Sequence, residues 1–150
     1  SNTVEVTLSA SLTSIANAQS YYNSDQAAID ANGGANGTNT PASASVTTVA
    51  DKCTVVGNLS AQTASGVTSD AGQNARTTNN GALGTGASDD KGDVTPAGSA
   101  TLTWNGLGAL DSWAIGLVSL RPPSGRTTKN TDLRPLGVFA GHSRHMPFQI

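Results

Sequence analysis

Residues 112–120 read SWAIGLVSL, the most apolar run of this 150-residue chain. Apolar side chains at both odd and even positions predict a central strand, either buried on both faces or lying at the core of a sandwich. Arg121-Pro122-Pro123 ends the run, because proline has no N–H to donate to a strand ladder. Upstream, residues 100–104 (ATLTW) predict another strand, followed by a turn at Asn105-Gly106. We expect these two strands to pair antiparallel and to bring Trp104 close to Trp113.

Further strands are predicted towards the N-terminus. Residues 3–12 alternate strictly between polar and apolar, as in a half-buried strand. Residues 14–23 suggest a second strand, with a helix as the alternative because Ala and Gln favour helices. Residues 44–50 and 53–61 predict a hairpin, and short strands are expected near 65–69 and 74–79. Residues 30–43 predict a loop, because Asn-Gly and Gly-Gly steps and a proline interrupt a ladder.

Length and charge limit the class of protein. One hundred and fifty residues correspond to about one domain. The formal net charge is −2 and 12% of the residues are charged, so no strong field is available to hold nucleic acid or an anionic membrane. Many short strands, glycine-rich turns and no long helix predict an all-β fold, an antiparallel β-sandwich of jelly-roll type.

The C-terminal residues differ in composition from the rest of the chain. Residues 1–120 carry three basic and nine acidic residues, whereas residues 121–150 carry five basic residues and one acidic residue. We therefore expect a β-sandwich domain over residues 1–122 and an extended basic arm over residues 123–150. The arm has apolar side chains that suit contacts with a neighbouring subunit, and the predicted contact residues are Arg134, Leu136, Val138, Phe139, Met146, Phe148 and Ile150. The alternatives are a terminus without a role and a nucleic-acid-binding tail.

Signals for catalysis, export and membrane insertion are sparse. Glu5 is the only glutamate, and the sequence has neither a nucleophile elbow nor a phosphate-binding loop. The single cysteine, Cys53, is expected to be a small buried side chain in a strand. No stretch approaches the ~20 apolar residues of a membrane span. Residues 1–12 lack the features of a signal peptide, so a leader, if one existed, is expected to have been removed. The sequence thus predicts a protein that is not an enzyme.

Metal binding has little support in the sequence. His142 and His145 lack the two further ligands of a zinc site, so they are expected to lie at a surface or an interface. No cofactor is expected. A calcium ion near Asp89, Asp90 and Asp93 remains open beside the plainer interpretation, a solvated acidic turn.

Sugar binding would require an exposed aromatic ring. The candidate platforms are Trp104, Tyr21 and Tyr22, whereas Trp113 begins the most apolar strand and is expected in the core. These residues keep a carbohydrate-binding module open as an alternative function.

Residues 98–104 (GSATLTW) followed by residues 112–122 (SWAIGLVSLRP) resemble the end of a jelly-roll, concanavalin-like domain. That domain occurs in secreted bacterial proteins and in phage structural proteins. Residues 2–10, 22–30 and 44–56 are similar to earlier parts of the same domain, so the resemblance covers residues 2–122. It implies a β-sandwich, and it carries over no catalytic residues because the family shares none.

Two departures from the family lead to a hypothesis. In the family, several strands precede the one that opens this chain, and the domain usually ends at the Arg-Pro step. Here 28 residues follow Pro122. The arm is therefore expected to supply a strand, either to its own domain or to the next subunit.

The functional expectation that follows is a structural subunit at a virion surface or in an extracellular filament. Its expected partners are identical subunits or other capsid or filament proteins. In the alternative function the partners are glycans. Binding to nucleic acid and insertion into a membrane are not expected.

Overall fold

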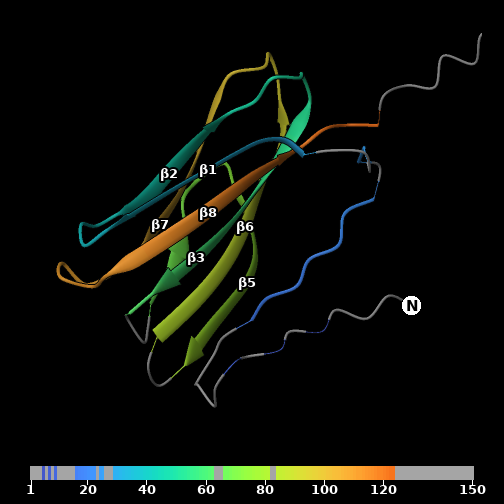
Figure 1. Ribbon diagram of the computed structural model, residues 1–150. Coiled ribbons are helices and arrows are strands. Elements are labelled where there is room, and N and C mark those ends of the chain that lie inside the picture. Colours follow the sequence, from blue (N-terminus) through green and yellow to red (C-terminus); the bar gives the residue numbers. More distant parts are fainter. Residues whose placement is uncertain are drawn as a thin grey trace, which may run out of the picture.

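The computed structural model describes residues 5, 7, 9, 16–22, 24–25, 29–62, 66–81 and 84–123. These residues form eight strands and no helix (Figure 1). The strands are β1 (Ile29–Gly37), β2 (Ala42–Thr47), β3 (Cys53–Ala61), β4 (Thr68–Ser69), β5 (Asn74–Gly81), β6 (Gly84–Val94), β7 (Ser99–Asn105) and β8 (Trp113–Leu120).

The strands form two antiparallel sheets packed face to face, which confirms the predicted β-sandwich. The five-stranded sheet has the order β1-β8-β3-β6-β5, and the three-stranded sheet has the order β2-β7-β4. Alternate side chains from both sheets fill the space between them, as period-two strands require. The largest buried side chain is that of Trp104, and the core around it is rich in small residues: Ala42, Ala44, Val46, Val55, Leu59, Ala61, Val67, Ala87, Ala100, Leu102, Leu107, Trp113, Ile115 and Leu117.

The sequence located most strands but not their partners. The predicted strands over residues 44–50, 53–61, 65–69, 74–79, 100–104 and 112–120 all have counterparts. The predicted hairpin is wrong, because β2 pairs with β7 while β3 pairs with β6 and β8. The expected pairing of residues 100–104 with 112–120 is also wrong, because β7 and β8 belong to different sheets. The period of a strand determines which side chains are buried, whereas its partner depends on how the chain crosses between the sheets.

The loop predicted over residues 30–43 is wrong for most of its length, because β1 covers its first part and β2 begins at Ala42. Strand β1 pairs with β8 along its whole length at the edge of the five-stranded sheet. A Cβ atom at Gly33 would lie 2.8 Å from the Ser45 carbonyl oxygen, and one at Gly34 would lie 2.6 Å from the Ile115 carbonyl oxygen. The glycines therefore permit close approach of two backbones, which is an established use of glycine within a strand.

β8 is a central strand with one face in the core of the sandwich, which is one of the two predicted arrangements, whereas burial on both faces is wrong. Ile115 and Leu117 point into the core, whereas Ala114 and Gly116 are exposed on the outer face of the five-stranded sheet. Residues 16–22 lie against this outer face. They form neither the predicted strand nor the alternative helix.

Two predicted elements fall largely or wholly outside the described residues. Within the predicted strand over residues 3–12, only residues 5, 7 and 9 are described, and none of them lies in a strand. Residues 124–150, which hold almost all of the predicted arm and all of its contact residues, are not among those that the structure describes.

Substitution of Gly57 tests how closely the core is packed. A Cβ atom there would lie 2.6 Å from Leu102 Cδ1, 2.7 Å from Leu117 Cδ2 and 3.0 Å from Trp104 Cη2. Gly57→Ala should therefore lower the free energy of unfolding, measured by urea denaturation, by about 1–3 kcal/mol. Gly116→Ala is the matched control, since a Cβ atom there has nothing within 4 Å. Its free energy of unfolding should stay within about 0.5 kcal/mol of the parent, and equal effects of the two substitutions would contradict the described packing.

Candidate functional site at one end of the sandwich

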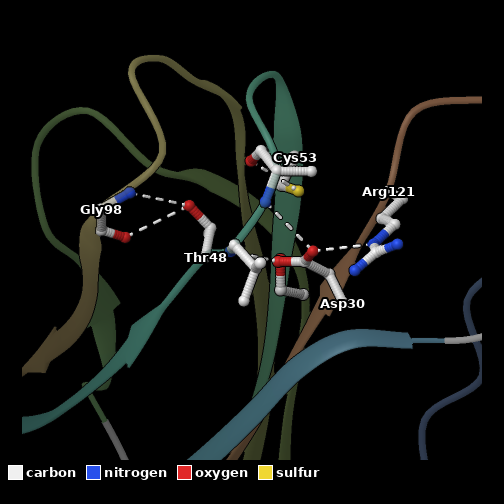
Figure 2. Close-up of polar contacts among 8 residues, drawn as sticks. Asp30, Thr48, Cys53, Gly98 and Arg121 are labelled. Carbon is white, nitrogen blue, oxygen red and sulfur yellow. Dashed lines mark hydrogen bonds and ion pairs between the residues drawn. The ribbon is translucent and has the colours of Figure 1, made fainter.

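The carboxylate of Asp30 joins three parts of the chain at one end of the sandwich (Figure 2). It accepts hydrogen bonds from the backbone N–H groups of Val49 at 2.7 Å and Ala50 at 3.2 Å, which connect β2 to β3. It also accepts bonds from Ser119 Oγ at 3.2 Å and from Arg121 Nε at 2.9 Å, at the end of β8. One side chain of β1 thus fixes both the crossover between the sheets and the exit of the chain from β8.

Asp30 is charged because its partners outweigh its burial. Its side chain is 0% exposed, and burial alone would raise the pKa of the carboxyl. Hydrogen bonds from the Val49 N–H and the Arg121 guanidinium, with smaller contributions from Cys53 and Ala50, instead bring the pKa of Asp30 below its ordinary value. Arg121 remains 43% exposed, so one side of this ion pair faces water.

Cys53 lies beside Asp30 at the start of β3 and is fully buried. Its thiol donates to the Ala50 carbonyl oxygen at 3.1 Å. Burial raises the pKa of Cys53, so the sulfur stays in the neutral thiol form. The prediction of a small buried side chain in a strand is therefore confirmed.

Thr48 and Gly98 close the other sheet at the same end. Thr48 Oγ1 donates to the Gly98 carbonyl oxygen at 3.2 Å, and the Gly98 N–H donates to Thr48 Oγ1 at 3.0 Å (Figure 2). Nearby, the Ala97 N–H donates to Asp51 Oδ1 at 2.6 Å. Polar side chains therefore cap this end of both sheets.

A second buried carboxylate, that of Asp90, attaches residues 16–22 to the outer face. Asp90 Oδ1 accepts from Asn74 Nδ2 at 2.8 Å and from Arg76 Nη2 at 3.1 Å, and Arg76 Nε donates to Oδ2. The Tyr21 hydroxyl donates to Asp90 Oδ2 at 3.0 Å. Burial would raise the pKa of Asp90, but the bonds from Arg76, Asn74 and Tyr21 lower it overall. Burial, together with the contact to this carboxylate, raises the pKa of Tyr21.

Asp89 points the opposite way, into the gap between the sheets. Gln73 Nε2 donates to Asp89 Oδ2 at 2.5 Å and to the Thr103 carbonyl oxygen at 2.8 Å. The Thr103 N–H donates to Gln73 Oε1 at 3.0 Å. The Gln73 amide thus pairs with the backbone of Thr103 as a neighbouring strand would, and it links the two sheets where β4 is short.

These positions alter the interpretation of the acidic residues in β6. Asp89 and Asp90 are 0% and 1% exposed, so the solvated acidic turn is wrong for both of them, while Asp93 is exposed. Consecutive strand residues face opposite sides, so Asp89 and Asp90 cannot face one ion together. In the part of the chain that the structure describes, no group of three or more His, Cys, Asp or Glu side chains comes together. A calcium ion near these residues stays an untested prediction.

The three predicted sugar platforms lie in different environments. Trp104 is 0% exposed, so a sugar cannot reach it and its place as a platform is wrong. Trp113 is buried as expected, and its indole N–H donates to the Asn39 carbonyl oxygen at 2.6 Å. Tyr21 is partly buried, with its hydroxyl bonded to Asp90 and to Gln19. Tyr22 alone is open, with 89% of its surface exposed.

Tyr22 borders a hollow of about 410 Å³ at the end where β8 leaves the sheet. Leu120, Pro122 and Pro123 provide its apolar lining, and Lys52, Thr54, Asp93 and Arg121 provide polar groups. Lys52 and Asp93 both have left-handed backbone conformations, with φ of 60° and 53°. This hollow could not be predicted from the sequence, because its lining comes from four segments far apart in the chain.

Comparisons with family models, with curated proteins and with solved structures returned no match to this chain. The described residues include no helix of the length and apolarity needed to cross a membrane. The site must therefore be interpreted from its own geometry.

Acid should weaken the fold through the two buried carboxylates. The pKa values of Asp30 and Asp90 are lower in the folded chain, so their stabilisation is complete above the unfolded value of about 4. It is lost as the pH falls through the folded values. Asp30→Asn should cost about 2 kcal/mol at pH 7 and flatten the pH dependence of the free energy of unfolding. Asp70→Asn, at an exposed position, is the control. An unchanged acid profile in Asp30→Asn would contradict the assignment.

Gln73→Glu should weaken the contact between the two sheets beside the short strand β4. The substitution places a second carboxylate beside buried Asp89 and removes the donor to Thr103. We expect the free energy of unfolding at pH 7 to fall by about 2–3 kcal/mol. Gln62→Glu, at an exposed glutamine, should have little effect. Equal stability of the two variants in urea denaturation would show that the Gln73 amide does not link the sheets.

Proposed function

We propose that this chain is a non-enzymatic structural subunit of an extracellular or viral assembly, as a decoration protein at a virion surface or as a filament subunit. In this proposal the sandwich is the surface module, and the arm over residues 123–150 docks it to identical neighbours or to other proteins of the particle. The arm acts by adding a strand or an apolar anchor to its acceptor.

The observation that carries the proposal is the fixed starting point of the arm. Arg121 directly follows β8, and its guanidinium is held by the fully buried carboxylate of Asp30. The Arg121 carbonyl oxygen also accepts from the Asp25 N–H at 3.0 Å. β8 lies between β1 and β3, so a force applied to the arm would be transmitted to a central strand of the five-stranded sheet. A fixed attachment point of this kind suits a segment that holds a subunit in place.

Unpaired strand edges offer places where an added strand can bind. In the described sheets, β1 and β5 are the edges of the larger one and β2 and β4 the edges of the smaller one. The two residues of β4 pair only with Trp104 and Asn105 of β7, which leaves the rest of that side of β7 without a strand partner. Exposed edges of this kind accept strands from other chains.

Charge favours contact between the arm of one subunit and the body of another. The formal charge is −6 over residues 1–120 and +4 over residues 121–150. Opposite charges on two surfaces accelerate association and select partners, and the effect weakens with salt. Assembly should therefore depend on ionic strength.

Deletion of residues 124–150 tests this proposal. The shortened chain keeps Arg121, so its sandwich should still fold, while self-association or co-assembly measured by sedimentation velocity should be lost. Full-length chain with Phe139→Ser and Phe148→Ser is the second variant, since it removes two apolar anchors and leaves every charge in place. If both variants assemble with the same dependence on protein concentration as the parent chain, docking through the arm is refuted.

A further inference from the structure

We propose that the hollow beside Tyr22 is a carbohydrate-binding site that takes a neutral sugar unit at the end of a glycan. It is a second property of the subunit, separate from docking through the arm. The hollow, of about 410 Å³, falls in the range of roughly 300–1,000 Å³ that is common for small-ligand sites.

The first argument is the exposed aromatic ring. Tyr22 is 89% exposed, whereas Trp104 and Trp113 are buried and Tyr21 is partly covered. An exposed tyrosine ring keeps a large apolar face in contact with water, and such rings are enriched at sites where a ligand or partner covers them. The C–H groups on one face of a sugar ring can pack against it. Leu120 and the rings of Pro122 and Pro123 extend this apolar surface into the hollow.

The second argument is the set of polar groups around the same hollow. Lys52 and Asp93 line it with exposed side chains, and neither makes an ion pair or a side-chain hydrogen bond within the described part of the chain. An ammonium group donates hydrogen bonds and a carboxylate accepts them, so together they can bind the hydroxyl groups of a sugar. Thr54 adds a hydroxyl that can do either.

Backbone geometry places these two side chains at the hollow. Lys52 and Asp93 both adopt left-handed conformations, which are unfavourable for a residue other than glycine. The Lys52 N–H is held by the Val94 carbonyl oxygen at 2.9 Å and by Thr95 Oγ1 at 3.2 Å. The surrounding structure therefore maintains two unfavourable conformations at one hollow, as functional sites often do.

The balance of charge selects a neutral ligand. Asp30 neutralises Arg121, and the remaining cation, Lys52, is matched by Asp93. A phosphate or an acidic sugar would meet no excess of positive charge here. An uncharged polyhydroxyl ligand can use both signs, because each hydroxyl group is a donor and an acceptor.

The test uses the full-length chain on an array of neutral and acidic oligosaccharides, followed by calorimetric titration with the neutral tetrasaccharide that is best retained. Tyr22→Ala should weaken binding about tenfold or more, as expected for loss of one stacking ring. Tyr22→Phe should retain it, because the ring rather than the hydroxyl makes the contact. Asp93→Ala should also weaken it.

Leu110→Ala is the matched control, since Leu110 is 87% exposed on a loop that does not line the hollow. Thermal unfolding of each variant establishes that the sandwich is intact. Retention of acidic glycans alone, lost at high salt, would assign binding to the basic arm and overturn the proposal. Absence of any retained neutral glycan, unchanged binding by Tyr22→Ala, or binding of a protein partner in place of sugars at this hollow would overturn it as well.

Discussion

The contact on which the rest of the structure depends is the buried carboxylate of Asp30 with its four donors. It lies where β1 begins, where the chain crosses from β2 to β3 and where β8 ends. A charge removed from water destabilises a fold unless hydrogen bonds and an opposite charge compensate for it. Here two backbone N–H groups, the Ser119 hydroxyl and Arg121 all point at the same carboxylate. The start of β1, the crossover between the two sheets and the exit of the chain from β8 are therefore positioned together.

Polar side chains make important tertiary contacts in this fold, since the apolar core is built largely of small side chains. Five of the fifteen residues in its main cluster are alanines, and each buries little surface. The Gln73 amide bridges β6 and β7, Asp90 holds residues 16–22 on the outer face, and Thr48 binds Gly98 across the smaller sheet. Contacts of this kind are directional, so they determine the relative placement of strands that alanines alone would leave less defined.

The proposed roles occupy different parts of one end of the sandwich. The chain leaves the sheet at Arg121, just before the proposed arm, and the hollow beside Tyr22 is formed by the residues around that exit. The sequence indicates the aromatic residues as candidates, but it does not distinguish the buried indole of Trp104 from the exposed ring of Tyr22. The difference could not be seen from the sequence, because a strand that ends in a tryptophan is compatible with either burial or exposure.

The sequence by itself determined the all-β class, the positions of most strands and the buried state of Cys53 and Trp113. Those features follow from local periodicity and residue type, which operate over a few neighbours. Only the tertiary structure decided that β2 and β3 lie in different sheets, that the glycines of β1 belong to a strand, and that Asp89 and Asp90 are buried. The reason is that pairing, close backbone approach and the burial of a charge all depend on partners that are distant in the chain.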